Sequence, residues 1–127
     1  MGIIRVKTVT IIPAAAHELM INAVCSYYDM TKSELIARAR NRELARRKGI
    51  LFFLLKFDGQ LSSSDVAGLC ETTRQNVDQA VDRTEGEINI YLQSACDCRN
   101  IRAIYASLQK EQTEWLNRDS QQNNTRL

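Results

Sequence analysis

The stretch that begins at Thr72 gathers side chains that bond to anions and to base edges. Thr72 and Thr73 carry hydroxyl groups, which bond phosphate oxygens. Arg74-Gln75-Asn76 follows, with Gln79 one helical turn further on. An arginine fork matches O6 and N7 of guanine, and a glutamine or asparagine amide matches adenine. At the start of a helix, these residue types predict base reading in a DNA major groove and phosphate contacts by the two threonines.

A second group is a run of basic residues upstream of that stretch. It contains six cations and one acid, Glu43, although the formal net charge of the whole chain is only +2. One acid cannot neutralise six cations through pairs three or four residues apart, so a solvated helix face explains the run less well than an anionic partner does. The cations are Arg38, Arg40, Arg42, Arg46, Arg47 and Lys48.

Other chemistry finds little support in the sequence. The Cys96 and Cys98 pair has the wrong spacing for a zinc site, and His17 has no His or Cys three to five residues away. We therefore expect the four cysteines to be reduced and partly buried. Motifs of phosphate loops, hydrolases and zinc proteases are absent from the sequence. The sequence predicts a protein that is not an enzyme and uses neither cofactor nor metal.

The composition predicts a single all-α domain. The chain has 127 residues with only five glycines and one proline, which favours long helices over a turn-rich β fold. The longest apolar run, Ile50–Leu55, is far shorter than the roughly 20 residues that cross a bilayer. The first residues lack the apolar core of a secretion signal. We expect a cytoplasmic protein without membrane contact, associated with the nucleoid.

Capping signals divide the first half into helices. We expect residues 1–12 to form an N-terminal arm and residues 13–28 to form a helix that opens with a proline. Thr31 and Glu34 form a capping box that starts a short second helix. That helix delivers the first basic residues to a loop, and a third helix covers about Asn41–Phe57.

The second half predicts three more helices, which makes a compact bundle of about six. Ser62 starts a short helix, residues 71–73 form a turn, and Thr72 is the expected N-cap of the next helix. Gly86 is expected to kink or interrupt that helix. A last helix is expected over about residues 88–116, broken near residues 96–100, before a disordered polar tail at 117–127. Residues 13–116 would then form the domain.

Residues 63–83 fit the template of a helix-turn-helix. Two short helices joined by a turn of three or four residues define this motif. Small residues stand where the helices approach, and apolar residues stand where they face the core. The small residues are Ala67 and Gly68, and the apolar ones are Val66, Leu69, Val77 and Val81. Many helical proteins use such a pair for packing alone, but the basic run favours DNA binding.

Residues 17–110 resemble the C-terminal DNA-binding domain of the bacterial replication initiator DnaA. Residues 24–35 are similar to the first helix of that family and its entry into the second. Residues 38–48 resemble its basic loop, Ile50–Leu55 its apolar helix, and Leu61–Val81 its helix-turn-helix. Residues 97–108 match the place of its final helix. The resemblance implies an all-α bundle similar to the Trp repressor.

The resemblance also implies where individual residues would touch DNA. Arg40, with Arg42 beside it, falls where the family inserts an arginine into the minor groove, and Lys48 falls where an arginine holds phosphate. Residues 74–76 fall on the triplet that reads bases. The sequence departs from the family at the turn, and Gly49 replaces a glutamine. We therefore expect a target other than the family's standard binding box.

These observations favour a small transcriptional regulator that binds double-stranded DNA in a sequence-specific way, of phage or mobile-element origin. One alternative is an accessory, origin-binding replication protein without ATPase activity. A second alternative is a helical adaptor whose basic run binds an acidic protein.

Two side chains have a plain packing alternative. Trp115 is expected to pack back on its own domain, and the alternative is a homodimer or partner contact through the C-terminal helix. Arg74 is expected to read guanine, and the alternative is a structural pair with Asp78.

Overall fold

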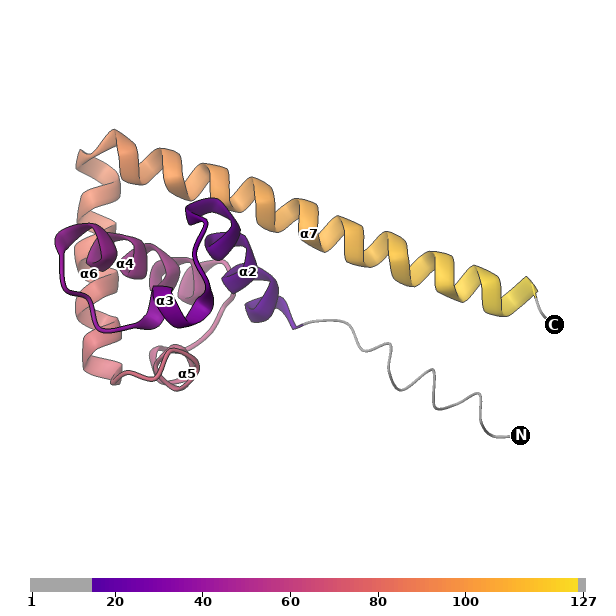
Figure 1. Cartoon of the computed structure of the whole chain (residues 1–127), viewed down its shortest axis with the longest axis horizontal. Helices are drawn as coiled ribbons and strands as arrows, with labels where there is room; N and C mark the ends of the chain where they lie inside the picture. The colour runs from indigo at the N-terminus through magenta and orange to yellow at the C-terminus, as the bar shows by residue number, and fades with distance from the viewer. Residues whose placement is uncertain (1–14, 126–127) are drawn as a thin grey trace.

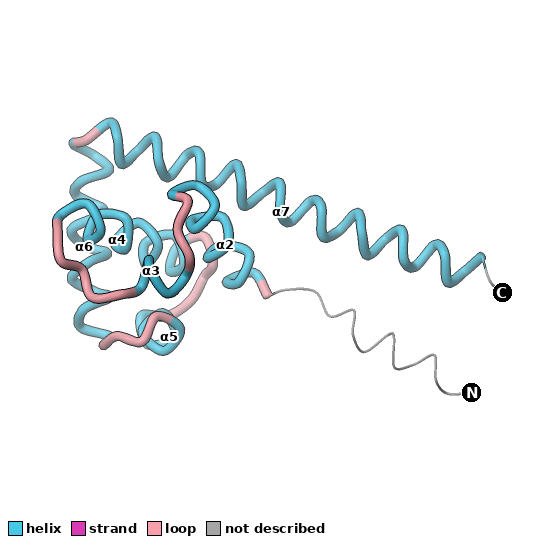
Figure 2. Tube along the Cα trace, in the orientation of Figure 1, coloured by secondary structure: helices cyan, strands magenta, loops and turns pink. Residues whose placement is uncertain are grey.

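The computed structural model describes residues 15–125, which fold as six helices without a strand (Figures 1 and 2). The predicted all-α bundle is therefore confirmed. The N-terminal arm and the expected proline start of the first helix lie outside the described residues. The helices are α2 (Ala16–Tyr28), α3 (Lys32–Ile36), α4 (Arg42–Phe57), α5 (Ser63–Leu69), α6 (Arg74–Ile90) and α7 (Leu92–Thr125).

Side-chain caps set the starts of four of these helices. Thr31 forms the predicted capping box with Glu34, and Ser62 accepts a hydrogen bond from the backbone N–H of Asp65. Asn41 caps α4 in the same way. The predicted cap of α6 is wrong by one residue, because Thr73, not Thr72, has the extended backbone of an N-cap and accepts from the Asn76 N–H.

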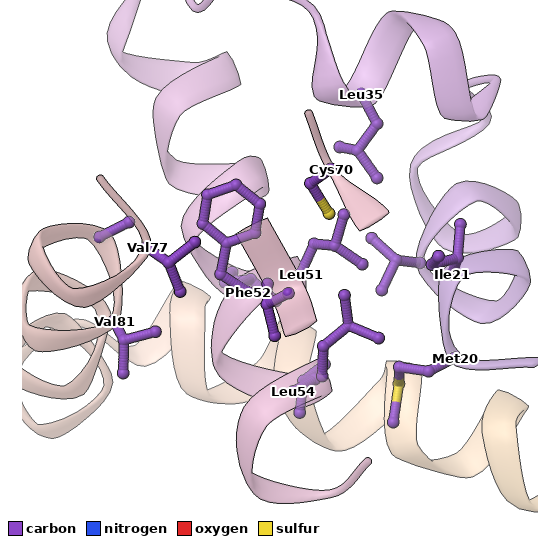
Figure 3. Packing of buried hydrophobic residues seen from close by; sticks show 14 of the residues in the cluster. Met20, Ile21, Leu35, Leu51, Phe52, Leu54, Cys70, Val77 and Val81 are labelled. Carbon is purple, nitrogen blue, oxygen red and sulfur yellow. The ribbon is translucent and has the colours of Figure 1, made fainter. Parts of the chain in front are cut away.

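Helix α4 forms the middle of the core. Leu51, Phe52 and Leu54 lie between side chains of α6 on one side and of α2 on the other (Figure 3). Met20 and Ile21 come from α2, and Val77 and Val81 come from α6. Because α4 is apolar on several sides, it holds the basic residues of its first turns at a fixed place relative to α6.

Helices α4 and α6 approach closely at Gly49. A Cβ atom built at this position would lie 2.4 Å from Oγ1 of Thr84, a fully buried side chain of α6. The crossing therefore requires a residue without a side chain at position 49.

The corner between α6 and α7 falls at Tyr91, which the sequence did not indicate. Tyr91 has an extended backbone, and its carbonyl oxygen accepts a bond from the Ala95 N–H at the start of α7. Helix α6 continues through Gly86, and α7 continues through residues 96–100, so the breaks that the sequence predicted at these two places are wrong. The helix can continue there because Asp97 and Cys98 are buried against the bundle.

Helix α7 extends well beyond the bundle and ends at Thr125 (Figure 1). The sequence predicted a polar tail from residue 117, whereas the structure continues the helix for nine residues more, through a stretch with neither glycine nor proline. Trp115 lies on the projecting part and is 47% exposed. The hollow around its ring is lined by residues of α7 alone, so the expected packing onto the bundle is not observed.

Candidate nucleic-acid interface

The N-terminal end of α6 presents the polar residues that the sequence singled out. Helix α5 and residues 70–73 pack beneath it, with Val66 and Val77 fully buried between the two helices. Glu71 takes a left-handed backbone conformation (φ 55°), which turns the chain sharply. The exposed side chains at this end are Arg74, Gln75, Asn76 and Gln79.

The Arg74 side chain is more exposed than a purely structural pair with Asp78 would require. Its side chain is 73% exposed, and Nε lies 3.8 Å from Oδ2 of Asp78, at the edge of an ion-pair contact. Asp78 also accepts a short hydrogen bond from Ser63 of α5. The carboxylate, which Lys56 also approaches at 3.8 Å, is therefore held by the fold. The structure thus contains the alternative pair of Arg74 with Asp78, while most of the Arg74 side chain remains exposed.

The first cations of the basic run are exposed. Arg38 and Arg40 lie in the loop between α3 and α4, and Arg42 is the first residue of α4. Within residues 15–125, the structure records no hydrogen bond or ion pair for these three side chains. Their charges are available to an external anion.

Arg46 and Arg47, which the sequence assigned to phosphate, are engaged inside the fold. Arg46 donates to Glu43 and, through NH1, to Oδ2 of Asp97 at 2.8 Å. Arg47 donates to Glu43 at 2.9 Å and stacks 4.7 Å from the centre of the Tyr28 ring. The local charge count missed Asp97, which is distant in sequence and supplies Arg46 with a second acid.

Asp97 is the centre of a buried polar network. Its side chain is 1% exposed and accepts hydrogen bonds from Tyr27, Tyr28 and Gln93 as well as from Arg46. Burial alone would raise the pKa of this carboxyl, but the four hydrogen bonds outweigh burial and lower its pKa. Burial, with the bond to Asp97, raises the pKa of Tyr28 well above its usual value. The network ties α2, α4 and α7 together.

A cleft of about 230 Å³ joins the basic loop to the outer face of α6. Ala39 of the loop, Lys48 of α4, and Asn76 and Gln79 of α6 line it. The Lys48 ammonium donates to the carbonyl oxygen of Ala37 at 3.0 Å, which ties the loop to α4. Burial lowers the pKa of Lys48. The structure thus brings Lys48 of the basic run, next to the loop that carries Arg38 and Arg40, to one surface with Asn76 and Gln79 of α6.

Arg83 also lines this cleft, and the sequence analysis missed it. It is exposed on α6, seven residues after Asn76 and therefore on the same side of the helix. It also lines a neighbouring hollow with Arg42. The helical spacing of Asn76, Gln79 and Arg83 is the signal that would have revealed it.

Thr72 lies one residue before the N-cap of α6, and not at the cap where the sequence predicted it. Its hydroxyl oxygen accepts a hydrogen bond from the side-chain amide of Asn76 at 3.1 Å, and it lines the same cleft. This bond orients Asn76 across the cleft. Thr73 is occupied as the cap of α6.

The described residues carry no group that could hold a metal ion, and their four cysteines form no disulfide. Burial raises the pKa values of Cys70 and Cys98 to about 11, which keeps both thiols protonated and unreactive at neutral pH. Within residues 15–125, no helix has the length and apolar character needed to cross a membrane.

No protein-family model, curated protein or solved structure matches this chain.

Proposed function

We propose that this chain is a small transcriptional regulator that binds double-stranded DNA in a sequence-specific way. The observation that carries the proposal is the shared cleft, in which a loop with unpaired cations adjoins the polar face of α6. A surface of this kind combines phosphate attraction with side chains that discriminate bases.

In this proposal α5 and α6 act as a helix-turn-helix, and the N-terminal end of α6 enters the major groove. Arg74, Gln75, Asn76 and Gln79 would face the bases. Arg83 lies about 10 Å further along the helix than Asn76, by the rise of an α-helix. The major groove is about 12 Å wide, so Arg83 would reach the phosphates at its edge.

The basic loop supplies the second contact. Arg40 and Arg42 would enter the adjacent minor groove, where narrow A·T-rich DNA attracts arginine. Arg38, Lys48, Thr72 and Thr73 would contact phosphates. Arg46 and Arg47 are left out, because their guanidinium groups hold the fold together. The resemblance to the DNA-binding domain of DnaA belongs to this proposal and supports the same two-groove arrangement.

Selection of bound duplexes from a random pool tests the proposal. We expect an enriched motif whose flank is A·T-rich. Arg74→Ala should then weaken binding to the selected duplex by about 1–3 kcal/mol and change binding to random duplexes little. Arg99→Ala, which removes an exposed arginine of α7, is the matched control and should leave both affinities unchanged.

Equal losses on selected and random duplexes would show that α6 only positions the protein. If no motif is enriched and duplex DNA fails to compete with an acidic protein, the adaptor alternative holds instead. Footprints at promoters rather than at replication origins would separate a transcriptional role from an accessory replication role.

A further inference from the structure

The C-terminal end of α6 forms an apolar groove with α4. Phe53, Phe57 and Ile88 line it, with Glu85 on its rim, and its volume is about 290 Å³. The two phenylalanine rings lie 4.9 Å apart, and Phe57 is 47% exposed.

The groove is large, and no side chain of the described residues fills it. An apolar cavity of about 150 Å³ already admits benzene, so the groove has space for a larger aromatic ring. The corner beside it exposes three consecutive large side chains, from Ile90 to Leu92, each by more than half. Contiguous apolar surface of this kind marks a contact site.

Within residues 15–118, one more large hydrophobic side chain is exposed. It is Trp115, which is 47% exposed and lies on the projecting part of α7. Arg118 follows it by one helical turn, and Glu111 precedes it by one. Trp115 lies 23 residues after Leu92, or about 35 Å along a continuous helix. Because α7 begins directly after α6 and runs away from it (Figure 1), Trp115 lies too far along α7 to reach the groove of its own chain.

We propose that the groove receives Trp115 from a second copy of this chain. The charges around the two surfaces are complementary. Glu85 borders the groove on the α6 side, and Lys56 of α4, whose ammonium also lies 3.8 Å from Asp78, is 5.9 Å from the centre of the Phe57 ring. Beside Trp115 stand Arg118 on one side and the acids Glu111 and Glu114 on the other. Within the described residues the structure gives no ion pair to Glu85 or Arg118.

The contact joins two different surfaces, so it is of the head-to-tail type. Either two copies exchange their α7 ends reciprocally, or copies add one after another. The inference does not rest on the proposed function. Arg83 of the proposed DNA surface and Glu85 of the groove are two residues apart on α6 and therefore point to different sides of that helix, so both contacts can form at the same time.

Sedimentation equilibrium of the full chain over a range of concentrations tests the proposal. We expect a mass above that of the monomer, and Trp115→Ala should weaken association by about 30-fold or more, as for aromatic residues at interface centres. Arg99→Ala changes an exposed side chain of α7 that lines neither the groove nor the hollow around Trp115, and it should leave association unchanged. A wild-type chain that stays monomeric at every concentration would overturn the proposal.

A mixing experiment distinguishes this contact from direct pairing of two α7 helices. Trp115→Ala keeps the groove, and Phe57→Glu keeps the tryptophan but blocks the groove. Each variant alone should be monomeric, and their mixture should form a 1:1 complex. Association that survives Phe57→Glu, or a mixture that stays monomeric, contradicts the proposal. Circular dichroism checks folding, and Glu85→Arg is a second groove variant at an exposed position.

Discussion

The two halves of the basic run have opposite roles although their compositions are similar. Arg38, Arg40 and Arg42 are exposed and have no recorded ionic partner within residues 15–125. Arg46 and Arg47, only one turn further along α4, are bound to Glu43 and to the network of Asp97. The difference shows that a local charge count measures how many cations are present, but not how many are free.

The largest effect that the comparison predicts is on stability. Arg46→Ala leaves the buried Asp97 carboxylate without its cationic partner, and loss of one member of a buried pair costs about 3–5 kcal/mol. Because the Arg46 side chain is 20% exposed, we expect a loss near the lower end, about 3 kcal/mol. Urea unfolding followed by circular dichroism measures it.

Arg42→Ala is the matched control, four residues away on the same helix. Its side chain is exposed and unpaired within the described residues, so the free energy of unfolding should change by less than about 0.5 kcal/mol. Similar losses for the two variants would mean that the division between tied and free cations is wrong.

The second effect is on DNA affinity, under the proposed function. Replacing Arg38, Arg40 and Arg42 together by alanine removes three cations that would neutralise DNA charge, Arg38 at a phosphate and the other two from the minor groove. The plot of log K against log salt should therefore flatten by about 0.9 for each lost cation. By the same relation, affinity at 0.15 M salt should fall by roughly 100-fold. Fluorescence anisotropy with a labelled duplex gives both quantities.

The double variant Arg99→Ala/Lys110→Ala removes two exposed cations from α7, and it controls for the change in net charge. Per charge removed, this double variant should change the slope of log K against log salt much less than the loop variant does. An equal change would show that the protein attracts DNA through its overall charge, and that the loop has no special place.

The third effect is on the pH dependence of stability. The pKa of Asp97 is lowered in the folded protein, so its ionised form stabilises the fold above the ordinary pKa of an aspartate, about 3.9. That contribution is lost as the pH falls through the lowered value. Unfolding free energies measured between pH 6 and pH 2 should therefore decrease steeply in acid.

Asp97→Asn should remove much of this acid sensitivity, since the amide does not titrate. Glu43→Gln is the comparison, because the hydrogen bond from Arg46 also lowers the pKa of Glu43, but that side chain is 51% exposed. We expect a smaller change there. If Asp97→Asn keeps the full acid dependence, the network does not hold its carboxylate in the charged form.

The sequence predicted the local features of the fold well. The capping box at Thr31, the cap at Ser62 and the apolar stripe of α4 each depend on residues within one or two turns, where spacing and side-chain chemistry decide. The corner at Tyr91 carries no glycine or proline, and it was missed because packing of α7 on α2 and α6 sets it.

The candidate site was predictable in its exposed part only. Asn76 and Gln79 lie on one face because a helix places them there, and the sequence shows that spacing directly. Arg46 is bound inside the fold because of Asp97. Asp97 is 51 residues away in the sequence and contacts Arg46 only once α7 has packed on the bundle. Long-range pairs of this kind have no signature in local patterns.

The smallest expected effect on stability comes from Arg47, whose contacts within the fold are weaker than those of Arg46. It shares the half-exposed Glu43 with Arg46, and its guanidinium group stacks on Tyr28. Exposed pairs contribute about 0.2–1 kcal/mol, and a cation–π contact adds about 0.5–1 kcal/mol. We expect Arg47→Ala to cost about 1 kcal/mol in urea unfolding.

Arg47→Lys should recover only part of that loss, because an ammonium group keeps the charge but lacks the flat surface that stacks on the ring. Under the proposed function, DNA affinity of the folded Arg47→Ala variant should stay within about twofold of the wild type, since no phosphate contact disappears. A salt slope reduced by about 0.9 would instead place Arg47 among the free cations. Of the two arginines, Arg46 alone would then be held by the fold.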